Sequence, residues 1–375
     1  MTQVALPRQE PSWADQGHSN REYLTTAVGA PSEHRKRDCP ICGSPKVETV
    51  LSGRDRIFLQ PGDYEVVRCG SCRVLFTWPW PRDTMSCYPQ DYFAHVDYTL
   101  PETQDRGMRG VKSELRRLAR IYHFGYGTPA GGVRGAFEWL ISYPLRGRAE
   151  GWFGSLPKHV KGGRVLDVGC GSGHWLACLS QLGTWELWGV EPSALGCETA
   201  RKHGIDHVME SDLSGAGLPE NNFDVVRIWH VLEHTHSPRE VLDEAYRVLK
   251  PGGLLIVGVP NGGSVMFRLF GTYWFHLDLP RHLFHFSKPV LIRLVRDIGF
   301  RIVSFASRPQ GRSSLFTSLC LLMNERNRNG RFQPDVQLPG ERFLQRSLMV
   351  FFWGLDRLGL GDTVELRAYK PFGAK

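Results

Sequence analysis

The chain has 375 residues, a length that predicts about two domains. Apolar residues make up 41% of it, as in ordinary globular proteins, and no run of about 18 apolar residues predicts a membrane-spanning helix. The net charge of +8 favours acidic partners such as nucleic acid, anionic lipid or a phosphorylated substrate, although a basic surface without a special partner explains it equally well.

Residues 1–35 are polar and lack periodicity, which predicts a disordered tail and no signal peptide. The chain has nine cysteines, and four of them form two C-x-x-C pairs. This usage indicates metal binding in a reducing compartment, so we expect a cytoplasmic location.

Residues 36–100 are predicted to form a zinc-ribbon-like module, because two C-x-x-C turns flank two short candidate strands. Backbone N–H groups in such turns point at sulfur, and four thiolates suit a structural, tetrahedral Zn²⁺ with no open position. The alternative is a set of ordinary reduced thiols. The candidate ligands are Cys39, Cys42, Cys69 and Cys72.

Residues 101–160 are predicted to be a helical connector. A basic helix is expected over 113–122, then a glycine-rich break, then a second helix over 137–143. A solvated linking helix is the simplest interpretation, and a lid or phosphate contact is the alternative.

From residue 161 candidate strands and helices alternate, which predicts an α/β fold with a doubly wound, mostly parallel, Rossmann-like sheet. The expected strands are 164–169, 186–191, 207–210, 223–229, 254–259, 300–304 and 363–369. The expected helices are 174–182, 193–203, 238–249 and 288–298. This domain is predicted to span 161–375, with a helical insertion at about 311–360.

The first of these strands runs into a glycine turn, Gly169-Cys-Gly-Ser-Gly173, with Asp167 just before it. Glycine lets the backbone turn tightly and approach a ligand closely. A dinucleotide fold would carry a third glycine where His174 stands, which weakens an NAD-linked oxidoreductase as an interpretation. Glu191 and Asp212 end the next two strands, where carboxylates can bind a nucleoside.

Histidines follow the fourth and fifth strands. The fourth leads into His230-Val-Leu-Glu-His234, and the fifth is followed by a segment that ends Pro-Arg-His282-Leu-Phe-His285-Phe-Ser. Taken together, residues of roughly 160–305 resemble class I S-adenosylmethionine-dependent methyltransferases. The last segment is similar to that of ubiquinone-pathway and saccharide-tailoring members, and the cysteine module to the ribbons of sugar C-methyltransferases.

The resemblance implies that S-adenosylmethionine (SAM) is the cofactor. It places Asp212 at the adenine amino group with Leu213 on the adenine face, although a turn cap is the alternative for Asp212. The cofactor residues that it implies are Asp167, Gly169, Cys170, Gly171, Gly173, Glu191, Pro192, Asp212, Leu213 and His230.

The acceptor is expected to be a small molecule or a saccharide intermediate, methylated on oxygen or carbon. Candidates for a base that takes the acceptor proton are His234, His282 and His285, because histidine titrates near neutrality. The alternatives are that they only brace loops or cap a helix, or that His276, His282 and His285 bind a second metal.

Apolar residues recur at helical spacing in the insertion, at 344, 348, 351, 352 and 355, with arginines nearby. Packing on the sheet is the simplest interpretation, and contact with a membrane surface or lipid-linked substrate is the sharper one. Two rival functions stay open: an RNA methyltransferase that uses the ribbon and basic surface, and a non-catalytic binding protein. The absence of an Asn/Asp-Pro-Pro-aromatic motif after the fourth strand weakens the first, and the intact glycine loop weakens the second.

Overall fold

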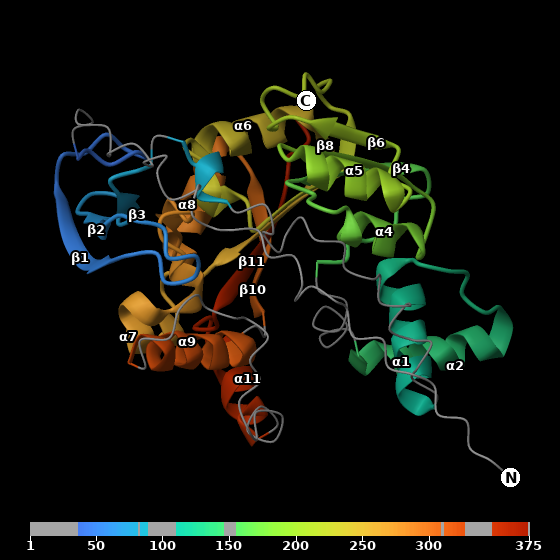
Figure 1. Cartoon of the computed structure of the whole chain (residues 1–375). Helices are drawn as coiled ribbons and strands as arrows, with labels where there is room; N and C mark the ends of the chain where they lie inside the picture. Colours follow the sequence, from blue (N-terminus) through green and yellow to red (C-terminus); the bar gives the residue numbers. More distant parts are fainter. Residues whose placement is uncertain are drawn as a thin grey trace, which may run out of the picture.

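The computed structural model describes residues 37–81, 83–88, 110–145, 155–308, 311–326 and 347–373 (Figure 1). The predicted N-terminal tail lies outside these residues, as does the middle of the predicted insertion. Within the described ranges, every helix is too short or too polar to cross a bilayer.

A seven-stranded sheet forms the centre of the molecule, in the order β10-β11-β8-β7-β4-β5-β6. The ladders among β4 to β8 are all parallel, and β11 pairs antiparallel with both β8 and β10. The predicted mostly parallel sheet is confirmed. Its strands are β4 (Gly163–Val168), β5 (Trp185–Glu191), β6 (His207–Glu210), β7 (Phe223–Trp229), β8 (Leu249–Pro260), β10 (Arg301–Arg308) and β11 (Thr363–Tyr369).

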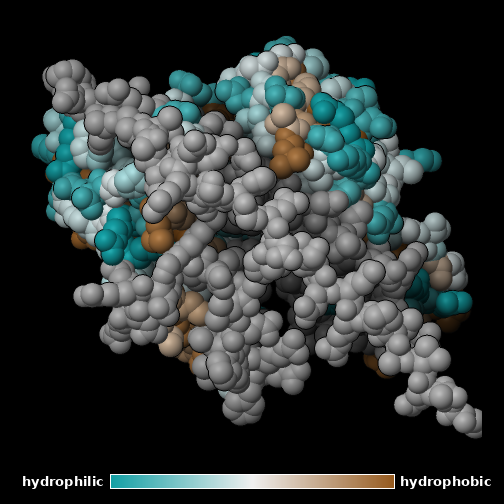
Figure 2. Space-filling view, in the orientation of Figure 1, coloured by the Kyte–Doolittle hydropathy of each residue, from teal (hydrophilic) through white to brown (hydrophobic). Residues whose placement is uncertain are grey.

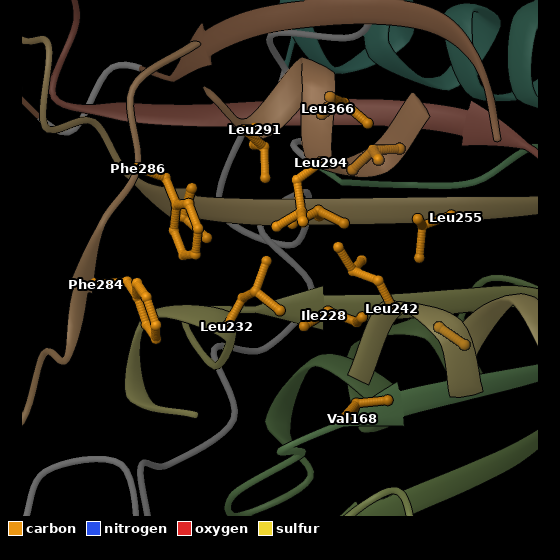
Figure 3. Close-up of a cluster of buried hydrophobic side chains, with 14 of the residues drawn as sticks. Val168, Ile228, Leu232, Leu242, Leu255, Phe284, Phe286, Leu291, Leu294 and Leu366 are labelled. Atoms are coloured by element: carbon orange, nitrogen blue, oxygen red, sulfur yellow. The ribbon is translucent and has the colours of Figure 1, made fainter. Parts of the chain in front are cut away.

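Helices cover both faces of this sheet, because successive strand residues point to opposite sides. Val165 packs into one buried cluster and its neighbour Leu166 into another. The first cluster includes residues of α1 (Val111–Ala119), α4 (His174–Ser180) and α5 (Ala194–Lys202). The second includes residues of α6 (Pro238–Val248) and α8 (Lys288–Ile298) and is drawn in Figure 3.

The N-terminal module is a small antiparallel sheet of β1 (Val47–Gly53), β2 (Tyr64–Cys69) and β3 (Leu75–Trp78). A fourth strand, β9 (Phe284–His285), continues it by pairing with β3. Because β9 lies in the segment after β8, the module is joined directly to the segment that carries the candidate bases His282 and His285. The sequence did not predict this pairing.

The connector and insertion contain the remaining helices. The basic helix α1 continues into one wider turn, Arg120–Phe124, and α2 (Gly132–Ser142) begins within the stretch that was expected to break the chain. Past β8 lie α7 (Val265–Phe270), α9 (Gly311–Arg326) and α11 (Met349–Arg357). Figure 1 shows α9 and α11 at the end of the molecule away from α6, close to α7.

Candidate active site

The four cysteines of the two C-x-x-C turns come together beside the end of β2. The Sγ atoms of Cys39 and Cys72 are 3.5 Å apart, those of Cys42 and Cys69 are 3.6 Å apart, and all four lie within 4.8 Å. Tetrahedral Zn–S bonds of about 2.3 Å place sulfurs about 3.8 Å apart, so these residues fit a zinc ion.

Backbone donors also favour a thiolate at this centre. The N–H groups of Ser71 and Cys72 each lie 3.3 Å from the sulfur of Cys69 and donate to it. Burial alone raises the pKa of the Cys69 thiol, but these bonds outweigh it and lower the pKa to about 7. Burial raises the pKa of the Cys39 thiol and that of Cys72 to about 11, so the backbone donors favour a thiolate at Cys69 while burial opposes one at Cys39 and Cys72.

The glycine turn between β4 and α4 requires its glycines. Gly169 has φ of 66° and Gly173 has φ of 72°, a region that side-chain-bearing residues rarely adopt. A Cβ at Gly169 would lie 2.3 Å from a methyl of Val231, and a Cβ at Gly173 would lie 2.8 Å from Ala200. The loop is therefore packed against the segment that follows β7 and against α5.

Glu191 holds this loop from the end of β5. Its buried carboxylate accepts the backbone N–H of Gly171 and that of Ser193, each at 2.9 Å. Ser193 in turn caps α5 by accepting the N–H of Gly196. The residue that was expected to bind a ribose thus stands beside the middle glycine of the turn.

Asp167 is engaged inside the protein. Its carboxylate accepts two hydrogen bonds from Arg227 of β7, at 2.8 and 3.1 Å, and it is 1% exposed. The Arg227 guanidinium also contacts the rings of Trp175 and Trp229, with its carbon 4.5 and 5.0 Å from their centroids. Sequence reasoning missed Arg227, although a lone arginine within the apolar strand Phe223–Trp229 was a readable signal.

Asp212 lies after β6 and is exposed. Its Oδ1 accepts the N–H of Gly215 at 2.6 Å, so this oxygen caps a turn, as the alternative interpretation had it. Leu213 is buried in the same hydrophobic cluster as α6 and α8.

After β7, His230 precedes a short helical turn, Leu232–His234, and His234 is its last residue. The Nδ1 of His230 lies 3.0 Å from Oε1 of Glu233, which is fully buried. Nδ1 of His234 lies 3.1 Å from the carbonyl oxygen of Arg281, to which it donates, and 2.7 Å from the hydroxyl of Tyr88.

His282 and His285 are both buried and bonded within the protein. Nδ1 of His282 donates to the carbonyl oxygen of His276 at 2.8 Å, and Nε2 of His285 lies 3.2 Å from the hydroxyl of Thr77. That hydroxyl donates to the carbonyl oxygen of His282 at 2.6 Å. Burial lowers the pKa of both rings, that of His285 to about 4, so both stay uncharged near neutrality.

A second group of potential metal ligands exists among the described residues. Atoms of Glu233, His234 and His282 lie within 4.8 Å of one another. This group differs from the set of His276, His282 and His285 that the sequence left open.

The zinc-ribbon-like module reaches this site through a buried ion network. Arg281 is fully buried and donates from Nη1 and Nη2 to Asp55 of the module, at 2.8 and 3.0 Å, and from Nε to Asp278 at 2.9 Å. A buried arginine needs such partners, because an unpaired charge inside a protein is very costly. The sequence did not indicate a role for Asp55 or Asp278. Their partner Arg281 lies far along the chain from Asp55 and across a turn from Asp278.

Residues 148–305 match the family model for a methyltransferase domain. This part of the chain is a methyltransferase domain. The match covers the glycine loop, Glu191 and the histidine segment through β9.

Curated relatives of the methyltransferase domain are ubiquinone biosynthesis O-methyltransferases. The protein of Maricaulis maris is 35% identical over 145 residues, which cover 36% of this chain and 56% of that protein. The protein of Bordetella avium is 29% identical over 149 residues, covering 37% and 61%. This chain spans 53% to 68% of the length of such relatives.

Among solved structures, a SAM-dependent methyltransferase of Thermotoga maritima, described as a possible histamine N-methyltransferase, matches with a TM-score of 0.37 and 22% identity. The match covers 56% of this chain and 83% of that one.

Proposed function

We propose that this protein transfers a methyl group from SAM to a hydroxyl oxygen of a small-molecule acceptor. The observation that carries this proposal is the methyltransferase-domain match over a glycine loop that Glu191 holds from the next strand. The relatives are O-methyltransferases, which favours oxygen as the acceptor atom.

The residues present fit this cofactor. The three glycines with positive φ leave no Cβ over the loop, and Glu191 is already fixed by two backbone donors beside it. SAM, when bound, supplies an electrophilic methyl group on a sulfonium. We propose that the glycine loop holds the amino-acid end of SAM, that Glu191 holds the ribose and that Asp212 holds the adenine. The enzyme's share of the chemistry is then to hold the acceptor oxygen in line with the methyl.

Calorimetry with SAM and mass spectrometry of products test the proposal. We expect saturable SAM binding, and one S-adenosylhomocysteine per methylated product with hydroxyl-bearing small molecules. Saccharide intermediates, including nucleotide-linked sugars, belong in the panel because of the resemblance to saccharide-tailoring enzymes, and fragmentation separates O- from C-methyl products. A purified protein that binds no SAM would contradict the proposal and favour a non-catalytic role.

We propose a structural Zn²⁺ at the four cysteines and a cytoplasmic location. The S···S distances and the donors to Cys69 support the metal. Nine free cysteines support a reducing compartment. The domain limits that we propose are 36–100 for the module, 101–160 for the connector and 161–375 for the methyltransferase domain.

An RNA substrate is less well supported than a small molecule. The module that could bind RNA directs several groups inward, since Asp55, Thr77 and Tyr88 contact the histidine segments. RNA binding that weakens steeply with salt would favour the RNA interpretation.

Contact with a membrane surface or lipid-linked acceptor is a further part of the proposal. On α11, Phe351 and Trp353 are more than half exposed while Phe352 is buried, and Arg357 stacks on Trp353. On the face drawn in Figure 2, apolar residues form separate patches within a mostly hydrophilic described surface. Co-sedimentation with anionic liposomes should fall when Phe351 and Trp353 are replaced by serine, and unchanged binding would remove the idea.

A further inference from the structure

His230 has an unusual backbone for a residue at the end of a buried strand. Its φ is +53°, a left-handed conformation that side-chain-bearing residues rarely adopt. The conformation is held in place, because the N–H of His230 donates to the carbonyl oxygen of Gly258 on β8 at 2.9 Å. Such strain is typical of positions where the direction of a side chain matters.

A buried carboxylate orients the His230 ring. Oε1 of Glu233 accepts from Nδ1 of His230 at 3.0 Å, and Oε2 has no hydrogen-bond partner among the described residues. Nδ1 of His230 donates to this carboxylate oxygen, so in the neutral ring Nε2 carries the lone pair.

His230 also lies between the glycine loop and the histidine segment that follows β8. Its neighbour Val231 packs against Gly169 of the glycine loop. On its other side, the ring of His276 stacks on His230, with centroids 6.0 Å apart and planes 9° from parallel. The His230 side chain is 27% exposed, whereas those of Glu233 and His282 are 1% and 8% exposed.

We infer that His230 is the general base that takes the acceptor proton, and that Glu233 is its positioning residue. This inference rests on the proposed function. The acceptor O–H bond breaks and its proton passes to Nε2. The new O–C bond forms as the S–C bond breaks, and the electron pair of the S–C bond stays on sulfur. The positive charge of the sulfonium is thereby transferred to the imidazolium beside Glu233, and the proton then leaves to water.

The sharpest variant is His230→Gly. Glycine accepts positive φ, so the backbone relaxes and the fold is kept, while a space opens where an added imidazole can bind. With 3,4-dihydroxybenzoate as the hydroxyl-bearing probe and S-adenosylhomocysteine as the readout, we expect a loss of about 10²- to 10⁴-fold in kcat. Added imidazole should restore part of it, and SAM binding, measured by calorimetry, should remain saturable.

Two matched variants separate a base from a structural role. His230→Asn tolerates positive φ and keeps a donor for Glu233 but provides no base, so it should be inactive and not rescued by imidazole. Glu233→Gln should lower kcat more than it changes the acceptor KM. Wild-type kcat in His230→Gly, with SAM bound, would overturn the assignment of the base and leave the proposed function standing.

A readout that needs no acceptor completes the test. Nitrogen NMR of ¹⁵N-histidine protein should show the proton of neutral His230 on Nδ1, and Glu233→Gln should shift it toward a mixture of tautomers. A proton found on Nε2 in the wild-type protein would overturn the inference. Failure to bind SAM at all would instead contradict the proposed function.

Discussion

At the scale of single residues, Gly169 shows why the loop tolerates nothing larger. Its φ of 66° disfavours any side chain, and a Cβ would also meet Val231 at 2.3 Å. We expect Gly169→Val to abolish SAM binding measured by calorimetry. The control is Gly217→Ala, because Gly217 has φ of 60° with nothing within 4 Å of its Cβ position. The Gly217→Ala variant should lose only about 1–2 kcal/mol of stability, because alanine disfavours this backbone conformation. Its affinity for SAM should therefore be retained. Equal affinity in both variants would contradict the packing argument.

Asp167 is a less direct probe of the cofactor than the sequence implied. Asp167→Ala leaves the Arg227 guanidinium, 11% exposed, without its carboxylate. We expect the free energy of unfolding to fall by about 3–5 kcal/mol in urea denaturation. The double change of Asp167→Leu with Arg227→Met should recover most of this loss, because no charge is then left buried. A single variant as stable as the wild type would show that the pair contributes little.

Buried neutral histidines make the stability of the protein sensitive to acid. Burial lowers the pKa of His276, His282 and His285, that of His285 to about 4. An unfolded histidine titrates at about 6.5. The unfolded chain therefore binds more protons between these values, and stability falls as the pH falls through that window. For His285 alone, we expect the free energy of unfolding to fall by about 2 kcal/mol when the pH is lowered from 6.5 to 5.

Urea midpoints at pH 7 and pH 5 measure this loss. His285→Asn should show a smaller difference between the two midpoints than the wild type, because one fewer proton is taken up on unfolding. If the urea midpoints of the variant and the wild type differed equally between pH 7 and pH 5, the lowered pKa of His285 would be contradicted.

At the scale of elements, the β3–β9 pairing ties the zinc-ribbon-like module to the histidine segment. Leu75 pairs with His285, and Phe76 pairs with Phe284. A sheet this small buries little apolar surface, so a metal should supply much of its folding free energy. Order lost at the four cysteines would pass directly to β9 and to the His282 backbone that Thr77 binds.

Zinc removal tests this link. We expect one zinc per chain by mass spectrometry, and its removal with 1,10-phenanthroline should lower the thermal midpoint and raise the acceptor KM more than the Kd for SAM. Cys69→Ser should reproduce the effect, whereas Cys178→Ser, on the distant helix α4, should not. A metal-free wild-type protein with an unchanged midpoint would exclude a structural zinc.

At the scale of the whole molecule, the sheet and the module form one connected structure. The buried cluster of α6 and α8 also contains Cys39, Val67 and Phe76 of the module. Arg281 adds a fully buried ion pair to Asp55 across the same boundary. Substitutions in the module are therefore expected to affect acceptor binding as well as metal binding.

The sequence determined the elements of the sheet, because hydrophobic periodicity and turn residues are both local signals. Periodicity placed β4 to β7 to within one residue at either end, and the two C-x-x-C turns placed the four cysteines that lie together. Boundaries shifted where pairing extends a strand, as at β8, which begins at Leu249 because Leu249 pairs with Phe223.

The tertiary structure decided which side chains meet. Arg227 with Asp167 and Arg281 with Asp55 are pairs that no local spacing reveals, since each joins residues far apart in the chain. The three histidines chosen from the sequence are bonded within the protein, whereas the His230 side chain, bonded to Glu233, is 27% exposed. A residue type shows which chemistry is available, but burial and hydrogen-bond partners decide which copy of it can perform that chemistry.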